Sequence, residues 1–225
     1  MSDDLEQLLK SIEVDLGDPA EWPAPVEFRD SLALCVLNSV YSLRASSPSV
    51  VNVLNRYRAA RPSADTDSGS DLLEAIGEAG GPEAFAHNVL RNGRTLPGTK
   101  RLRTIGIHEA LTKFETAEVA VHTAAELRQN AKNPAVKRAW LSVVGLGKLS
   151  WAYLLMNAGV DAETKPDVML QRFTRRALGS EGQVTPERTR QLLMAAAGHL
   201  DVQPRRLDRA IWWHESPYGQ VISRS

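Results

Sequence analysis

The stretch from Leu141 to Phe173, LSVVGLGKLSWAYLLMNAGVDAETKPDVMLQRF, decides the interpretation of the whole chain. It holds two apolar helical runs joined by the glycine turn Gly145-Leu146-Gly147, and a third helical pattern with Asp167 in its first turn. Two glycines this close together allow positive φ angles and let the backbone approach another surface closely. The stretch therefore predicts a helix, a tight turn, a second helix, a loop and a third helix.

The glycine turn is a candidate phosphate-binding site. Such a turn leaves successive backbone N–H groups without partners at the start of the next helix, which is predicted to begin near Leu149. Amide nests and helix N-termini bind phosphate oxygens, and the helix dipole adds to the attraction. Gly145, Leu146, Gly147 and the adjacent cation Lys148 are therefore predicted to contact phosphate. The alternative is a tight helix–helix turn that binds no ligand.

Outside this stretch the pattern is also helical. An N-cap residue followed by proline marks a helix start at Ser47-Pro48, Asn133-Pro134 and Thr185-Pro186. No segment shows the sustained period-two alternation that strands require, so the predicted fold class is all-α. Residues 61–70 are predicted to be a polar, mobile loop, because Ser63–Gly69 has no apolar residue beyond Ala64.

Composition and charge limit the function classes. The chain has 225 residues, 43% of them hydrophobic, which suffices for one sizeable core or two small lobes. The formal net charge is +0, so any nucleic-acid binding must come from a local basic face. The segment 92–103, NGRTLPGTKRLR, offers such a face near a Pro-Gly turn, with Arg94, Lys100, Arg101 and Arg103. These cations either contact phosphate or form an ordinary solvated surface.

Several site types are not expected. The single Cys35 excludes an intramolecular disulfide and a four-cysteine iron–sulfur cluster, and neither HExxH nor CxxC occurs, so no metal site is predicted. The glycine turn lacks the third glycine and the preceding strand of a dinucleotide fingerprint, so no cofactor is predicted. A membrane span and a signal peptide are also missing from the pattern. We expect a monomeric, cytoplasmic protein, associated with the nucleoid if the source is bacterial.

The order of these motifs resembles that of the helix-hairpin-helix DNA glycosylase superfamily, which includes endonuclease III and the adenine, 3-methyladenine and 8-oxoguanine glycosylases. The resemblance is carried by GLGK, by the apolar helix after it, and by the Asp that opens the next helix before QRF. It is clearest over Ala131–Leu178. It is weaker over Phe28–Tyr57, where FRDSLALCVLNSVYSL is similar to the early pocket-lining helix of the superfamily.

The resemblance implies an architecture. It implies two small helical lobes, residues 26–122 and 123–225, with a helix-hairpin-helix motif and a cleft between the lobes. Residues 1–25 would form an N-terminal helix and linker that pack on the second lobe.

The resemblance also implies a function, the hydrolysis of the N-glycosidic bond of a damaged or modified base flipped out of double-stranded DNA. Asp167 would stabilise the oxocarbenium-like transition state electrostatically, and it could also orient the attacking water. Asn38 and Tyr41 would line the base pocket or press into the duplex. The alternative for these two residues is a set of satisfied polar groups at a helix C-terminus.

Lyase activity is not expected. In the bifunctional members of the superfamily a lysine of the hairpin helix attacks the sugar and forms a Schiff base. Leu149 occupies the matching position here, so water is the expected nucleophile. Lys165, two residues before Asp167, is the possible alternative nucleophile.

A second hypothesis comes from a different class, a non-catalytic DNA-binding or scaffold protein that retains the hairpin. Two features favour it: the neutral net charge, and the segment LNSVYS, which lacks the glutamine that several members of the superfamily place there. On this hypothesis Asp167 is only a helix-start residue favoured by the helix dipole.

Overall fold

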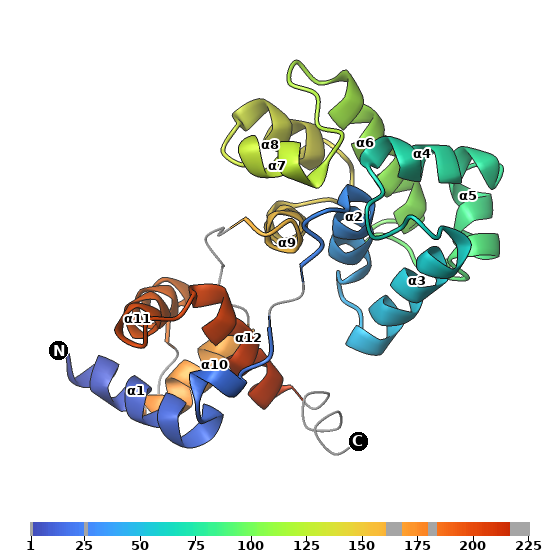
Figure 1. The fold of residues 1–225 in the computed structure, drawn as a ribbon. Coiled ribbons are helices and arrows are strands. Elements are labelled where there is room, and N and C mark those ends of the chain that lie inside the picture. Colours follow the sequence, from blue (N-terminus) through green and yellow to red (C-terminus); the bar gives the residue numbers. More distant parts are fainter. Residues whose placement is uncertain (1, 25–26, 161–167, 180–183, 217–225) are drawn as a thin grey trace. The chain divides into compact units, whose positions relative to one another are not determined.

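The protein is all-α, as predicted. The computed structural model describes residues 2–24, 27–160, 168–179 and 184–216, and these form helices with no strand (Figure 1). The one β-type pairing in the described ranges is an isolated antiparallel bridge between Thr95 and Leu102. No helix of the described residues is long and apolar enough to cross a membrane.

The chain divides into two compact units. Unit 1 comprises Met1–Val26 and Glu163–Ser225, and unit 2 comprises Glu27–Ala162. This division differs from the lobes expected from the sequence, because residues 123–162 belong to unit 2. Residues 1–26 are grouped with the C-terminal part of the chain. Each unit has its own hydrophobic core.

Unit 2 is built around one buried helix, α2 (Leu32–Tyr41), of whose ten residues nine are buried. Ser31 caps the start of α2 by accepting a hydrogen bond from the backbone N–H of Leu34. The other helices of this unit are α3 (Ser47–Ala60), α4 (Gly69–Glu78), α5 (Pro82–Ala84), the π-helical turn η2 (Phe85–Val89), α6 (Arg103–Thr116), α7 (Ala124–Gln129), α8 (Pro134–Leu141) and α9 (Lys148–Asn157).

The contact between α2 and α9 joins segments far apart in the sequence. Asn38 Nδ2 donates to Asn157 Oδ1 at 2.8 Å, and the side chain of Asn157 also donates to the carbonyl of Cys35 at 3.4 Å. The carbonyl of Asn157 accepts from the N–H of Phe28 at 2.7 Å. Asn157 is buried, so these bonds satisfy polar groups that would otherwise be costly in the core.

Unit 1 surrounds a smaller core. Its helices are α1 (Asp3–Leu16), the short 3-10 turn η1 (Pro19–Glu21), α10 (Val168–Ala177), α11 (Pro186–His199) and α12 (Pro204–Glu215). Leu8, Phe173 and Ile211 are central to the core, and Trp22 closes it with its indole N–H donating to the carbonyl of Leu16 at 2.9 Å. The apolar stripe of α1 therefore packs on the C-terminal helices.

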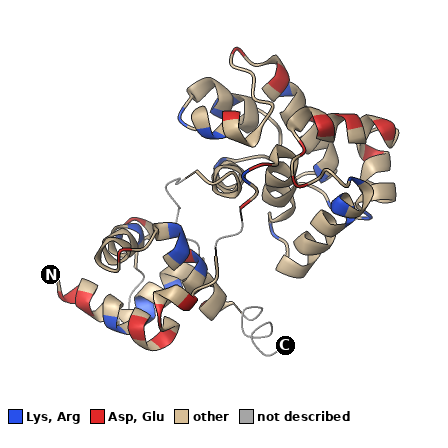
Figure 2. Cartoon of the chain, in the orientation of Figure 1, with Lys and Arg blue, Asp and Glu red and all other residues tan. Residues whose placement is uncertain are grey.

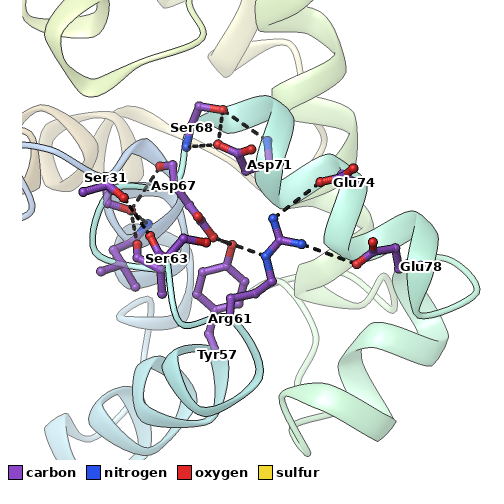
Figure 3. Close-up of polar contacts among 12 residues, drawn as sticks. Ser31, Tyr57, Arg61, Ser63, Asp67, Ser68, Asp71, Glu74 and Glu78 are labelled. Carbon is purple, nitrogen blue, oxygen red and sulfur yellow. Dashed lines mark hydrogen bonds and ion pairs between the residues drawn. The ribbon is translucent and has the colours of Figure 1, made fainter.

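The polar segment between α3 and α4 is anchored by buried hydrogen bonds rather than being a mobile loop, contrary to the prediction for residues 61–70 (Figure 3). Asp67 is 2% exposed, and its carboxylate accepts from the Tyr57 hydroxyl at 2.6 Å. Ser31 Oγ donates to the carbonyls of Ala64 and Asp67 at 2.7 and 3.1 Å. Arg61 forms ion pairs with Asp67, Glu74 and Glu78.

Burial and the hydrogen bond to Asp67 raise the pKa of Tyr57, so the phenol stays protonated and keeps donating. We expect Tyr57→Phe to lower the free energy of unfolding by about 2 kcal/mol, because it removes a donor from a buried carboxylate. Tyr41→Phe is the matched control, since the hydroxyl of that buried tyrosine donates to the Asn92 carbonyl only at 3.4 Å. It should cost less than about 1 kcal/mol. Urea unfolding of both variants measures the difference, and equal losses would contradict this account of the anchor.

Candidate nucleic-acid interface

Residues 142–147 connect α8 to α9 in a tight turn held by Ser150. The hydroxyl of Ser150, which is fully buried, accepts from the N–H of Gly147 at 3.0 Å and donates to the Gly147 carbonyl at 2.8 Å. The indole N–H of Trp140 on α8 also donates to this hydroxyl at 3.0 Å. Leu146 is 5% exposed and inserts into the core. The turn is therefore fixed from both helices.

The two glycines of the turn differ in their physical roles. Gly145 has φ 95°, and a Cβ at this position would lie 2.8 Å from Leu96 Cβ and 3.3 Å from the methyl group of Thr99. It combines a left-handed backbone with a close approach to another segment, the two properties that only glycine provides. Gly147 has φ −130°, and a Cβ there would meet no atom within 4 Å. Gly145 is therefore structural, and Gly147 leaves open space at the start of α9.

The segment that Gly145 contacts is the basic loop, defined here as residues 94–102. The bridge between Thr95 and Leu102 closes its base, and the N–H of Leu96 donates to the Arg101 carbonyl at 2.8 Å. Thr99 Oγ1 donates to the Leu96 carbonyl at 3.0 Å and accepts from the N–H of Arg101 at 3.1 Å. Two motifs that are separate in the sequence, the basic loop and the glycine turn, thus lie side by side in unit 2.

The four cations predicted as one cluster have different environments. Arg94 and Lys100 are exposed. Arg101 is half-buried, and its guanidinium pairs with Glu109 at 2.5 Å and reaches the Val144 carbonyl of the turn at 3.4 Å. The exposed cations remain candidates for phosphate contact, whereas the charge of Arg101 is partly compensated.

Arg103 does not lie on the surface, so neither alternative given for the four cations, phosphate contact or a solvated surface, describes it. It is 3% exposed. Its guanidinium donates at 2.5–3.1 Å to four backbone carbonyls, those of Val40, Tyr41, Leu43 and Thr95. Three of these carbonyls belong to the end of α2 and the residues just after it, where the helix dipole favours a cation. Burial nevertheless lowers the pKa of Arg103.

Glu109 and Lys113 complete the support of the turn, and sequence analysis missed both. The Glu109 carboxylate accepts from Arg101 and from Lys113, the latter at 3.2 Å, and the bond from Arg101 lowers the pKa of Glu109. Lys113 Nζ also donates to Ser142 Oγ at 2.8 Å. The i,i+4 spacing of Glu109 and Lys113 was the available signal. Both cations held by Glu109 therefore reach the α8–α9 turn.

The exposed side of the turn carries backbone N–H groups without acceptors among the described residues and two exposed apolar side chains. Within the described ranges, the N–H groups of Lys148 and Leu149 at the start of α9 have no hydrogen-bond acceptor. Leu149 and Val144 are 51% and 60% exposed although they are apolar. The Lys148 side chain is exposed as well. Free amides, a cation and two apolar tips therefore share this end of α9.

Apart from Glu109, which is paired with Arg101 and Lys113, the segments that build this surface have no carboxylate. Residues 84–108 and 127–160 contain no Asp or Glu, and each of these segments contains five Lys or Arg. The charged residues of α8, Lys137 and Arg138, are both basic, and Figure 2 shows the acidic residues of unit 2 on other elements, α4 among them. Phosphate approaching the turn would therefore meet little repulsion.

The residues of α2 expected to meet a base are engaged inside unit 2. Asn38 is half-buried and bonded to Asn157. Tyr41 is 2% exposed, and the Arg103 guanidinium lies 5.5 Å from its ring centroid. Burial raises the pKa of Tyr41. The ring of Tyr41 is too buried to protrude as a wedge, and a role of Asn38 or Tyr41 in lining a base pocket stays a prediction.

Asp167, the predicted catalytic residue, and Lys165, the possible alternative nucleophile, both lie outside the described residues. From the whole sequence, no metal site was predicted. In the described part of the chain, no group of three His, Cys, Asp or Glu side chains is arranged to hold a metal ion.

The contrast between the two glycines generates a stability prediction. Gly145→Ala should lower the free energy of unfolding by about 2–4 kcal/mol, because the new Cβ meets Leu96 in an unfavourable backbone region. Gly147→Ala is the matched control and should change it by less than about 0.5 kcal/mol. Thermal or urea unfolding of the two variants measures this. Equal stability of both would show that the turn does not pack on the basic loop.

The fold defines the chain as an all-helical protein of two units, one of which presents a basic, glycine-containing turn between two helices. The chain belongs to the family described as Domain of unknown function (DUF8548), whose model matches residues 6–216. No curated protein and no solved structure matches it.

Proposed function

We propose that the protein binds double-stranded DNA through the glycine turn and the basic loop, and that it is a DNA glycosylase with Asp167 as the catalytic carboxylate. The observation that carries the proposal is the packing of Gly145 on Leu96 and Thr99. That contact packs the turn that precedes α9 against the basic loop.

Phosphate binding at this place has a physical basis. A phosphodiester accepts hydrogen bonds from backbone N–H groups, and the two free amides of α9 lie at the positive end of a ten-residue helix. Lys148 and Lys100 supply exposed charge from the two neighbouring segments. The apolar tips Val144 and Leu149 suit contact with sugar or with the floor of a groove.

The proposed reaction is hydrolysis of the N-glycosidic bond of a damaged or modified base. Breaking this bond builds positive charge on the sugar, so a carboxylate beside the sugar lowers the barrier. Asp167 is assigned this role by its position before the helix that contains Gln171, Arg172 and Phe173, in the pattern of the glycosylase superfamily. Because Leu149 stands where the bifunctional enzymes have lysine, water is the nucleophile and no strand cleavage accompanies excision.

A non-catalytic DNA-binding protein is the second candidate, and one observation favours it. Asn38 and Tyr41, the α2 residues expected to receive a flipped base, are bonded within unit 2. A protein with the same turn and no base pocket would bind duplex DNA without turnover.

The turn can be tested by DNA binding. Gly147→Ala and Lys148→Ala should each weaken binding of a fluorescent duplex about tenfold. In Gly147→Ala the added Cβ occupies the open space where we propose that phosphate binds. In Lys148→Ala a cation is lost. Fluorescence anisotropy at fixed salt measures the affinity. Arg58→Ala is the control, since Arg58 is paired with Asp65 and not part of the turn. Unchanged affinity of both turn variants would refute the interface.

Catalysis can be tested by excision from duplexes that carry uracil, 8-oxoguanine, 3-methyladenine, 1,N6-ethenoadenine, 7-methylguanine or hydroxymethylcytosine. We expect strand cleavage at one of these bases only after alkali, and at least a thousandfold loss in Asp167→Asn with DNA affinity retained. Cleavage without alkali and a borohydride-trapped adduct would instead indicate a lysine nucleophile, with Lys165→Ala as the deciding variant. Binding without excision would support the non-catalytic candidate.

A further inference from the structure

Two exposed arginines of unit 2 adopt a backbone conformation that arginine rarely takes. Arg44, which follows α2, has φ 49°, and Arg91, which follows η2, has φ 47°. Only one other non-glycine residue of the described part, Asp201 in unit 1, has a positive φ. Glycine or asparagine would suit this region better than arginine. Such outliers persist where the surroundings impose them, and they concentrate at binding sites.

The loops that carry these arginines are held by hydrogen bonds from two other arginine side chains, Arg103 and Arg56. The Arg103 guanidinium donates to Leu43 on one loop and to Thr95 on the other. The Arg56 side chain donates to the carbonyls of Leu90 and Arg91 at 2.9 and 3.1 Å. The geometry of both loops is therefore held by cations rather than by apolar packing alone.

These loops bear positive charge without compensation. Residues 31–64 and 84–108 contain no Asp or Glu, and among the residues that the structure describes Arg44, Arg91 and Arg94 form no ion pair. Arg58, by contrast, pairs with Asp65 in the same unit. Arg94 also lies close enough to Arg103 for the like charge to lower the pKa of Arg103. Uncompensated like charges repel one another, so an anionic ligand here would relieve that repulsion.

We propose that Arg44, Arg91 and Arg94, called here the arginine patch, form a second phosphodiester-binding surface for DNA. The inference rests on the proposed DNA binding and extends it. The basic loop belongs to both surfaces: Leu96 and Thr99 contact the glycine turn, and Arg94 at the base of the loop is a member of the patch. On this proposal, one duplex contacts both surfaces through its phosphates.

The test is a double substitution, Arg44→Asn with Arg91→Asn, because asparagine tolerates a positive φ and removes the charge. Binding of a fluorescent duplex is measured by anisotropy at several salt concentrations. We expect affinity to fall about tenfold or more and the log–log salt slope to decrease in magnitude by about 2, one released counterion for each phosphate contact. Thermal unfolding verifies that the variant is folded.

The double substitution Arg44→Lys with Arg91→Lys is the matched control. It keeps the charge, so it should retain the salt slope of the unsubstituted protein. An asparagine variant with unchanged affinity and slope, alongside weakened Gly147→Ala, would overturn the arginine patch and leave the turn interface standing. An unsubstituted protein that does not bind duplex DNA even at low salt would overturn both the proposed function and this inference.

Discussion

The burial of the Arg103 guanidinium is the interaction on which the arrangement of unit 2 depends. It is a charge without a carboxylate partner among the described residues, satisfied by four carbonyl oxygens. Removing a cation from water is costly, and here that cost is offset by charge-assisted hydrogen bonds at the negative end of the α2 dipole. One side chain thereby joins the end of the central helix to the basic loop. The position of that loop decides where the glycine turn can pack.

From this junction the rest of the candidate surface follows. Because Arg103 holds Thr95, the neighbouring Leu96 is presented to Gly145, and the absence of a side chain at Gly145 lets the two backbones approach. Glu109 adds a second tie through Arg101 and Lys113, both of which reach the α8–α9 turn. Core packing and surface charge are thus parts of a single network.

Much of the fold could be predicted from the sequence because helix starts and turns depend on residues that are close together in the chain. N-cap and proline pairs predicted the starts of α8 and α11 and placed that of α3 one residue late, since its N-cap is Ser46, and the glycine pair predicted the α8–α9 turn. What could not be predicted depends on partners distant in the sequence. Nothing in NGRTLPGTKRLR distinguishes Arg103 from its neighbours, since its acceptors at Val40–Leu43 lie about sixty residues earlier. Asp67 is similar, because the buried Tyr57 and Ser31 that hold it are invisible to local composition.

The neutral net charge conceals an uneven distribution. In unit 1 the carboxylates of Asp15 and Glu215 pair with Arg176, and Asp4 pairs with Arg188. In unit 2 the acidic residues are interrupted by long segments that have none, residues 31–64, 84–108 and 127–160. The field that a phosphate experiences near the surface is set by charges within roughly a Debye length, about 8–10 Å at physiological salt, and not by the total over the chain. A sum of zero is therefore compatible with a local cationic track, and the position of the carboxylates carries more information about a polyanionic partner than their number.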